Sequence, residues 1–324
     1  MATISHPAFR ILIEKFGGCD EYFTEMINAS SLLNEGPYEK YYIDPAPVPE
    51  KVVWQLTGKD SDPMTKAAEV LVKLPGIGID INMGCAAPDI YKTGAGIGWM
   101  LKPREETFDM VGSVAKVVAE HNHQNPENKK RLSIKLRLGD DDFKEKDFFD
   151  FCEDLADLGV ELFTLHPRTK KEKLARPARY EYCQLLAERM HNRGVQVYLN
   201  GNVKDSASLE NALKKAPAVD GVMISRAAVE HPWIFRKLKD NNQSESLVID
   251  MQQLALDYIS DIEEYQPKDF WKTRLQRFFS YYSSNFLFGH YAQTEFLNAA
   301  DNDDLRNRIT AFFEKCPEER FQKL

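Results

Sequence analysis

Seven short runs of apolar and β-branched residues recur along the first 240 residues, and longer amphipathic segments separate them. The runs are Glu21–Ile27, Lys51–Gly58, Ile79–Cys85, Arg131–Gly139, Glu161–Thr169, Val195–Val203 and Gly221–Val229. The separating segments, such as Pro103–His121, Lys144–Leu158 and Pro177–Arg193, have the periodicity of helices. Strands that alternate with helices form a parallel sheet with covered faces. The number and even spacing of the runs favour an α/β fold of the (β/α)8 TIM-barrel type over an open doubly wound sheet.

The start of the sequence departs from this pattern. Pro7–Phe16 has the pattern of a helix and begins almost at Met1, so seven strands are predicted where a barrel of this type has about eight. We therefore expect a TIM barrel whose first strand is apparently missing from the chain.

The alternation of strands and helices stops after about Asp240. Asn241–Glu245 is polar and typical of a linker, and the chain beyond it has helical patterns over Leu247–Glu264, Lys268–Phe288 and Asp303–Cys316. These patterns predict a catalytic barrel domain over residues 1–240 and a small all-helical domain over residues 246–324.

Composition and cysteine usage indicate a cytoplasmic protein. No apolar run approaches the roughly 20 residues that span a bilayer, and the first residues lack the pattern of a signal peptide. The five cysteines are scattered and form no C-x-x-C pair. This distribution argues against a disulfide scaffold and against a structural zinc site, so we expect reduced thiols and no metal.

The net charge of −8 is unfavourable for a nucleic-acid partner, but two local runs are basic. The first contains Arg168, Lys170, Lys171, Lys173, Arg176, Arg179, Arg189 and Arg193. The second contains Lys268, Lys272, Arg274 and Arg277, interleaved with aromatic residues. Taken alone, either run is more often a solvated helix face. Together they are candidates for contacts with the phosphates of a nucleic acid.

Polar or titratable residues stand at the carboxyl ends of the predicted strands, where the catalytic groups of such barrels lie. They are Gln55, Asn82 and Cys85, Lys135 and Arg137, His166 and Arg168, Asn200 and Gly201, and Ser225 and Arg226. Each has a structural explanation when taken alone: a lone histidine is more often a satisfied core residue, and Asn-Gly is a turn signal. Their recurrence in successive βα units favours a common ligand site.

The last two of these positions suggest a phosphate site. Gly201-Asn202 and Ser225-Arg226 lie where barrels of this type commonly bind phosphate, and an arginine there adds a charge-assisted contact. With Lys135 and Gln55 in the barrel mouth, this set suits a phosphorylated planar cofactor such as FMN. No G-x-G-x-x-G segment follows a predicted strand, so a Rossmann-type dinucleotide domain is not expected.

Several of these segments are recognisable as a set. They are Ala8-Phe9-Arg10, Tyr22-Phe23-Thr24-Glu25-Met26, Asp80-Ile81-Asn82-Met83-Gly84-Cys85 with Lys92, Gly94 and Gly96, Lys135-Leu136-Arg137-Leu138-Gly139, His166-Pro167-Arg168-Thr169, Asn200-Gly201-Asn202-Val203 and Pro232-Trp233-Ile234-Phe235. On these residues the sequence resembles the tRNA-dihydrouridine synthase family over nearly its whole length. The Asn-x-Gly-Cys segment combined with the later ones is highly specific, whereas any single piece would be weak.

The resemblance implies an NAD(P)H- and FMN-dependent oxidoreductase that reduces a specific uridine in the tRNA D-loop to 5,6-dihydrouridine. FMN would be tightly bound and re-reduced by NADPH, and tRNA would be the macromolecular partner, with no membrane and no obligate protein partner. Cys85 matches the catalytic acid, and Asn82 and Arg168 match groups near the flavin and the target base. The positions that match FMN-binding residues are Gln55, Lys135, His166, Asn200, Gly201, Asn202, Ser225 and Arg226.

The chemistry of the reaction agrees with these roles. Reduction of the uracil C5=C6 bond needs a hydride and a proton, and the flavin can deliver the hydride to C6. A cysteine thiol is mostly protonated at neutral pH, so Cys85 can donate the proton to C5. A target base must also leave its stack to reach such a pocket, and we expect Arg176 and Arg179 of the first basic run to contact the RNA beside it.

Two other readings remain open at this stage. An FMN-dependent barrel oxidoreductase of a small molecule, similar to dihydroorotate dehydrogenase, would share the phosphate site and can share an active-site cysteine. It would not explain the aromatic and basic stretch from Lys268 to Phe288. The second alternative is a non-catalytic RNA-binding barrel that has lost its flavin, and a yellow colour on purification would exclude it.

Overall fold

The computed structural model describes residues 1–140, 142–172, 175–239 and 248–323. The chain packs as two compact units, and each is described by itself. The barrel unit comprises Glu21–Val203 and Ala207–Ile224, and the helical unit comprises Met1–Asp20, Lys204–Ser206 and Ser225–Leu324. The predicted linker Asn241–Glu245 and the predicted boundary between residues 240 and 246 lie outside the described residues.

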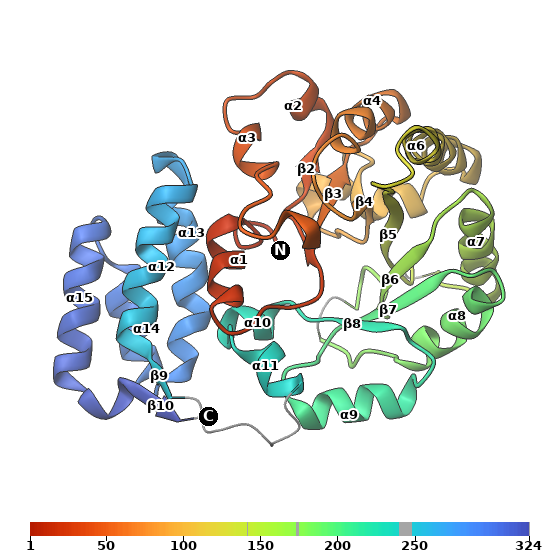
Figure 1. Cartoon of the computed structure of the whole chain (residues 1–324). Coiled ribbons are helices and arrows are strands. Elements are labelled where there is room, and N and C mark those ends of the chain that lie inside the picture. The colour runs from red at the N-terminus through yellow and green to blue at the C-terminus, as the bar shows by residue number, and fades with distance from the viewer. Residues whose placement is uncertain (141, 173–174, 240–247, 324) are drawn as a thin grey trace. The chain divides into compact units, whose positions relative to one another are not determined.

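One parallel sheet forms the centre of the barrel unit. Its strands are β1 (Tyr22–Phe23), β2 (Ile27–Asn28), β3 (Val52–Thr57), β4 (Gly78–Met83), β5 (Arg131–Arg137), β6 (Leu162–His166), β7 (Gln196–Asn200) and β8 (Gly221–Met223). Their order is β1-β3-β4-β5-β6-β7-β8, and β2 pairs with β3 beside β1. The sheet curls with helices on its outer side, as a TIM barrel does (Figure 1). Each of the seven predicted runs contains a strand, but the end of the last run, predicted as strand up to Val229, is helical because α10 begins at Arg226.

The first predicted run holds two short strands because Thr24 interrupts the ladder between them. The Thr24 backbone N–H donates to the Val53 carbonyl at 3.0 Å, and its hydroxyl accepts from the Gln55 N–H at 2.9 Å. The threonine thus replaces one ladder contact by a side-chain contact, and β1 and β2 both remain in register with β3. Among the described residues no strand pairs with β1 on its other side.

The helices of the barrel unit follow the strands in alternation. They are α2 (Ala29–Leu33), α3 (Glu39–Tyr42), α4 (Ser61–Leu71), α5 (Pro88–Tyr91), α6 (Arg104–Gln124), α7 (Glu145–Asp157), α8 (Glu181–His191) and α9 (Ser206–Lys215), with short 3-10 turns η1 (Pro49–Lys51) and η2 (Gly96–Met100). Three of the helical patterns predicted from the sequence correspond to α6, α7 and α8.

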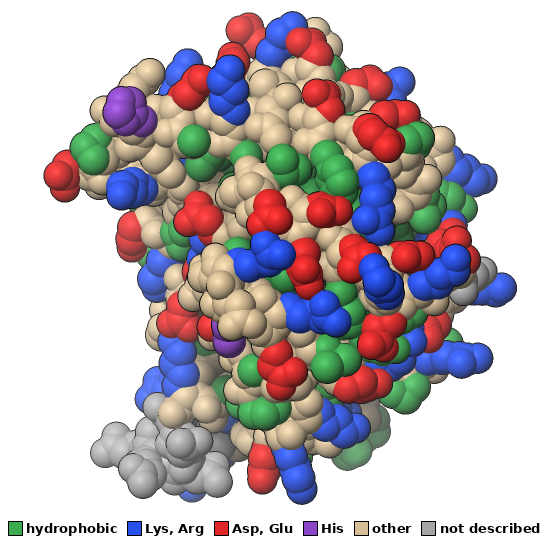
Figure 2. Space-filling view, turned by 90° about the vertical axis from the view of Figure 1, so that its right-hand side faces the viewer, with side chains coloured by type: hydrophobic (Ala, Val, Ile, Leu, Met, Phe, Trp, Pro, Cys, Tyr) green, Lys and Arg blue, Asp and Glu red, His purple; other side chains and the backbone are tan. Residues whose placement is uncertain are grey.

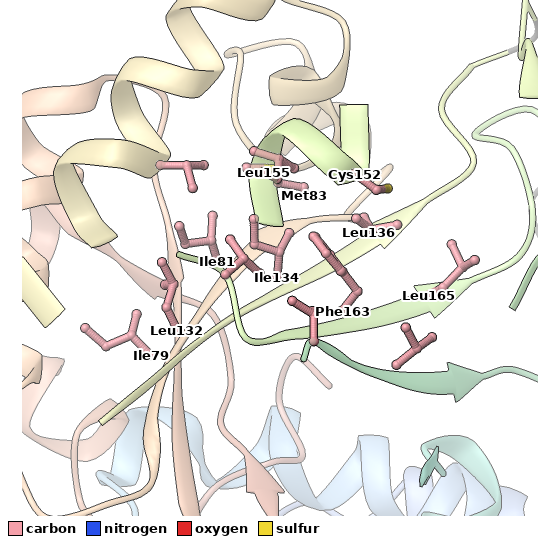
Figure 3. Close-up of a cluster of buried hydrophobic side chains, with 14 of the residues drawn as sticks. Ile79, Ile81, Met83, Leu132, Ile134, Leu136, Cys152, Leu155, Phe163 and Leu165 are labelled. Atoms are coloured by element: carbon pink, nitrogen blue, oxygen red, sulfur yellow. The ribbon is translucent and has the colours of Figure 1, made fainter. Parts of the chain in front are cut away.

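The two faces of the sheet carry different chemistry because successive side chains of a strand point to opposite sides. Outward residues of β4, β5 and β6, such as Ile81, Ile134 and Phe163, pack with Cys152 and Leu155 of α7 in one buried apolar cluster (Figure 3). The alternate positions of the same strands face the barrel interior and are mostly polar. This division places functional groups inside and the stabilising core outside.

The helical unit contains α1 (Pro7–Glu14), α10 (Arg226–Glu230), α11 (Ile234–Lys239), α12 (Met251–Tyr265), α13 (Lys268–Tyr282), η3 (Ser283–Asn285), α14 (Gly289–Leu297), α15 (Asn302–Lys315) and η4 (Pro317–Glu319). A short antiparallel pair, β9 (Val248–Asp250) with β10 (Phe321–Lys323), was not predicted. Aromatic rings fill the core of the helical unit, where Phe278, Tyr282 and Phe312 are buried. Within the described part of the chain, no helix is both long and apolar enough to cross a bilayer.

A buried ion pair connects three strands at the amino-terminal end of the barrel interior. The Arg131 guanidinium on β5 donates to both carboxylate oxygens of Glu21, which directly precedes β1, at 2.9 and 2.6 Å. Tyr198 on β7 donates to the same carboxylate at 3.1 Å. The side chains of Glu21 and Arg131 are only 17% and 15% exposed, so their charges compensate each other away from water.

Replacement of Glu21 by alanine is expected to lower the free energy of unfolding by about 3 kcal/mol, because it leaves a buried arginine without its counter-ion. Chemical denaturation measures the loss. Asp62→Ala is the matched control, since it removes the exposed Asp62–Lys66 pair on α4 and should leave the denaturation midpoint unchanged. Equal effects of the two substitutions would contradict the structural role of Glu21.

Candidate active site

Inward-facing polar side chains of β3, β4 and β5 form a hydrogen-bonded chain inside the barrel. The Gln55 amide donates to Asp80 Oδ2 at 2.8 Å and accepts from Asn82 Nδ2 at 2.9 Å. Ser133 donates its hydroxyl to Asp80 Oδ1 at 2.7 Å. The strand register brings these residues together, because Gln55 pairs with Asp80 and Asp80 with Ser133 in the ladder. All four side chains are buried.

Asn82 also fixes the loop that carries Cys85. Its Oδ1 accepts from the backbone N–H groups of Gly84 at 3.2 Å and Cys85 at 2.9 Å. The Cys85 carbonyl accepts from the Ile97 N–H at 3.0 Å, so the loop is held from both sides. Cys85 is half-buried, whereas the other four cysteines are buried. Of the five thiols, this one is therefore the best placed to meet a substrate.

Gly96 is packed directly against Cys85. Its φ of +57° is in the left-handed region, which glycine adopts without a Cβ penalty. A Cβ at this position would lie 2.6 Å from the Cys85 carbonyl oxygen and 3.1 Å from the Cys85 Cβ. The conformation of the cysteine loop therefore depends on the absence of a side chain at residue 96.

Lys135 lies beside Asn82 in the β4–β5 ladder and points into the barrel. Burial lowers the pKa of Lys135 to about 8, the positive charge of Arg137 adds to this shift, and the negative charge of Asp80 opposes it. Burial likewise raises the pKa of Asp80 to about 6, against the hydrogen bonds from Ser133 and Gln55. None of the described residues forms a hydrogen bond or ion pair with the Lys135 ammonium. The amine is thus available to an anionic or electron-rich ligand.

His166 and Arg168 form a second group at the carboxyl end of β6. An Arg168 N–H donates to His166 Nε2 at 2.7 Å, which requires the neutral imidazole with its proton on Nδ1. Arg168 also donates its Nε–H to the Arg176 carbonyl at 2.6 Å. Arg168 is fully buried, so its guanidinium holds the loop after β6 and positions the His166 ring rather than facing solvent.

Gly201 brings the end of β7 against this group. With φ of +131°, its Cβ position would lie 3.1 Å from the His166 ring and 3.3 Å from the Arg168 guanidinium. Tyr180 donates its hydroxyl to the Gly201 carbonyl at 2.8 Å, and Asn200 donates to the Met223 carbonyl at 2.8 Å. Asn202 follows with φ of +59°. The bare backbone at Gly201 therefore lies at the same end of the interior as His166.

The predicted residues do not all belong to one unit. Cys85, Gln55, Asn82, Lys135, His166, Arg168, Asn200, Gly201 and Asn202 lie in the barrel unit at or near the carboxyl ends of its strands. Ser225 and Arg226 lie at the start of α10 in the helical unit. The sheet brings the residues of the first group together.

The first basic run is largely neutralised within the protein. Arg189 and Arg193 of the α8 region pair with Glu153 of α7 at 2.9 and 3.3 Å, and Lys170 pairs with Asp140. Figure 2 shows cationic and anionic side chains interspersed over the face it presents, with no continuous basic surface.

The two arginines of this run that were predicted to contact RNA differ in their surroundings. Arg179 donates to Glu172 at 3.0 Å, and its guanidinium lies 5.4 and 5.1 Å from the ring centroids of Phe143 and Tyr182. Arg176 is exposed. An exposed side chain can reach a phosphate, whereas Arg179 would have to leave its protein partners first.

Sequence reasoning missed Asp80, Ser133, Gly96 and Tyr180 as parts of the site. Asp80 and Ser133 carry a signal that strand periodicity contains, since each stands two residues before a predicted site residue on the same face of its strand. Gly96 and Tyr180 act through contacts between loops that are distant in sequence, which no local pattern reveals.

The comparisons with known proteins point to one family. A family model described as dihydrouridine synthase matches residues 1–312. A probable tRNA-dihydrouridine synthase of Aquifex aeolicus is 29% identical over 83% of this chain and 80% of its own length. A tRNA-dihydrouridine synthase B of Pseudomonas syringae is 26% identical over 74% of this chain and 66% of its own length. A tRNA-dihydrouridine(47) synthase [NAD(P)(+)]-like protein of Xenopus tropicalis is 28% identical over 74% of this chain, which spans 35% of that longer relative.

The contact between Gly96 and Cys85 can be tested by alkylation of the half-buried thiol with iodoacetamide. Gly96→Ala should displace the Cys85 carbonyl from its hydrogen bond and raise the alkylation rate about fivefold, the factor that corresponds to roughly 1 kcal/mol for one lost hydrogen bond. Gly139→Ala is the control, because Gly139 also has a positive φ, of +90°, but open space within 4 Å of its Cβ position. A rate that is the same in both variants would show that backbone strain, not the contact, is responsible.

Proposed function

The chain belongs to the dihydrouridine synthase family, and from that premise we propose that it reduces a specific uridine in the D-loop of tRNA to 5,6-dihydrouridine. The observation that carries this proposal is the pairing of a half-buried thiol with an inward-facing amine. Cys85 stands in the loop after β4, and Lys135 lies on the neighbouring strand in register with Asn82, which anchors that loop. A proton donor and a cation at the mouth of a barrel suit the reduction of a conjugated base.

The interior residues fit FMN as the cofactor. The Lys135 amine has no partner among the described residues and favours an electron-rich group. The residues of the barrel unit that would hold FMN are Gln55, Lys135, His166, Asn200, Gly201 and Asn202. Ser225 and Arg226, which the sequence predicts to bind the phosphate, lie at the start of α10 in the helical unit. FMN, when bound, would supply the hydride that the uracil double bond requires, and NADPH would reduce it again.

The residues of the chain supply the proton and the geometry. We assign Cys85 as the general acid that protonates C5 of the base after hydride has been added at C6. The backbone contacts of Asn82 hold the loop so that the thiol keeps one position relative to the barrel mouth. The Lys135 ammonium stabilises negative charge that develops on the neighbouring ligand, as a preorganised cation in a buried site does. Asn82 and Arg168 would also border the target base.

The target uridine must leave its stack to reach a thiol at the barrel mouth. The exposed Arg176 is the member of the first basic run that we propose contacts the RNA backbone, and Lys268, Lys272 and Arg277, also exposed, are proposed to do so from α13. Arg274 is buried and is left out of this set. A reductase of a small molecule does not require the exposed cations of α13 for substrate binding. This difference favours tRNA over the dihydroorotate dehydrogenase-like alternative.

The function is tested by incubating the purified chain with FMN, NADPH and tRNA that lacks dihydrouridine, followed by mass-spectrometric mapping of the RNA. We expect dihydrouridine at one position of the D-loop. Cys85→Ala should still bind FMN and consume NADPH, but the rate of uridine reduction should fall by about 10²–10⁴, the usual contribution of general acid catalysis. FMN binding without any dihydrouridine formation by the wild-type chain would refute the tRNA substrate.

The pKa of Lys135 predicts how FMN affinity depends on pH. The amine is protonated below its pKa of about 8 and neutral above it, so the affinity for FMN should weaken as the pH rises from 7 to 9. Lys135→Met should weaken FMN binding about 10- to 100-fold at pH 7, as expected for the loss of a hydrogen bond from a charged group. The affinity of the Lys135→Met variant for FMN should also be independent of pH between pH 7 and 9. Fluorescence quenching of FMN measures both, and a parallel pH dependence in the variant would exclude Lys135 as its origin.

A further inference from the structure

Asp80 is a fully buried carboxylate on β4 that the proposed reaction does not use. Its two oxygens accept hydrogen bonds from neutral groups, Ser133 at 2.7 Å and Gln55 at 2.8 Å. A buried carboxylate is costly unless its interactions compensate for lost hydration. Ser133 alone would leave one oxygen without a donor, so the contact with Gln55 is needed on electrostatic grounds.

The ionised carboxylate has acceptors only, and this fixes the orientation of every amide that follows it. Gln55 must turn its NH2 group towards Asp80, so its carbonyl oxygen faces Asn82. Asn82 must then turn its own NH2 group towards Gln55, so its oxygen faces the backbone N–H groups of Gly84 and Cys85. The opposite orientation of either amide would place donor against donor.

We propose that Asp80 is a positioning residue for the proton donor, acting through the relay Asp80–Gln55–Asn82 on the backbone of Cys85. The inference rests on the proposed function for its consequence in catalysis, but the relay itself is a property of the protein alone. Asp80 forms the acceptor end of the relay, and the two loop N–H groups form its donor end. Each side chain of the relay therefore holds the next one in a single orientation, and the last of them, Asn82, holds the backbone of the loop that carries Cys85.

Charged groups around the relay provide the competing explanation, in which Asp80 acts as a counter-charge. The positive charges of Lys135 and Arg131 stabilise the ionised form of Asp80, and the positive charge of Arg137 lowers the pKa of Lys135. Arg131 already has Glu21 as its ion-pair partner. The two explanations differ in what they require of residue 80: the relay requires an acceptor facing Gln55, whereas a counter-charge to Lys135 requires a negative charge.

Two substitutions separate these requirements. Asp80→Asn removes the charge and keeps an oxygen that can accept from Gln55, whereas Asp80→Leu has the same branching and removes the acceptor. We expect Asp80→Leu to raise the rate of Cys85 alkylation by iodoacetamide about fivefold, the factor expected for one lost loop hydrogen bond. Its kcat for uridine reduction should fall about 10²-fold with an unchanged KM for tRNA, because a misplaced catalytic group costs about that much. Asp80→Asn should be alkylated at the wild-type rate, because the relay needs only an acceptor that faces Gln55.

Thr164→Val is the matched control, since Thr164 is also a buried inward-facing residue and its hydroxyl has no hydrogen-bond partner among the described residues. It should leave the alkylation rate unchanged. A second measurement combines Asp80→Leu with Asn82→Leu: if both act on the same loop contact, the double variant should be alkylated no faster than Asn82→Leu alone. Should Asp80→Leu fail to fold, Gln55→Leu interrupts the same relay one link further on and is measured in the same way.

Three results would overturn the proposal. They are a wild-type rate of Cys85 alkylation in Asp80→Leu, equal alkylation rates in Asp80→Asn and Asp80→Leu, or additive effects of Asp80→Leu and Asn82→Leu on the alkylation rate of the double variant. The alkylation assay needs neither FMN nor tRNA. A wild-type chain that shows the expected alkylation pattern but forms no dihydrouridine would therefore refute the proposed function and leave the relay intact.

Discussion

Polar groups inside a barrel must be hydrogen-bonded, because they lie away from water and an unmade bond there is costly. This constraint organises the site more than any single residue does. The Asp80 carboxylate demands donors, Ser133 and Gln55 supply them, and the second end of the Gln55 amide then demands a donor from Asn82. The position of Cys85 follows from the last contact of this series. The apolar cluster on the outer face of the sheet makes the arrangement possible, since it stabilises the strands whose inner positions are given over to polar groups.

The sequence predicted the strands well because their signal is local. A run of β-branched residues with a polar residue at its carboxyl end identifies both the strand and its functional end, as Lys135 on β5 and His166 on β6 illustrate. The interruption of the first run by Thr24 was not predictable in this way. It depends on a hydroxyl that accepts from Gln55 on the neighbouring strand, 31 residues away in the chain. The pair of β9 with β10 escaped for the same reason, since its partners lie far apart in sequence.

Charge patterns are the hardest part of the sequence to interpret, because distance along the chain says little about which charges meet in space. The run from Arg168 to Arg193 is strongly basic along the chain, yet Arg168 is buried and Arg193 pairs with acidic residues of the preceding helix. Surface pairs of this kind contribute little to stability, but they cancel the field that a phosphate would otherwise meet. A chain with a net negative charge can therefore carry a long basic run without presenting a basic surface there. The candidates for contacts with RNA are the cations that remain exposed, such as Arg176.

The electrostatics of the interior show why the amine and the carboxylate have to be considered together. Burial drives both towards neutrality, lowering the pKa of Lys135 to about 8 and raising that of Asp80 to about 6, while their mutual attraction opposes both shifts. At neutral pH both groups thus remain charged, but each lies much closer to its titration point than on the surface. Asp80 already has two donors, whereas the amine has no partner among the described residues. Within the described residues the cation is the half of this arrangement that lacks a direct partner, so an anionic or electron-rich ligand that enters the barrel would supply one.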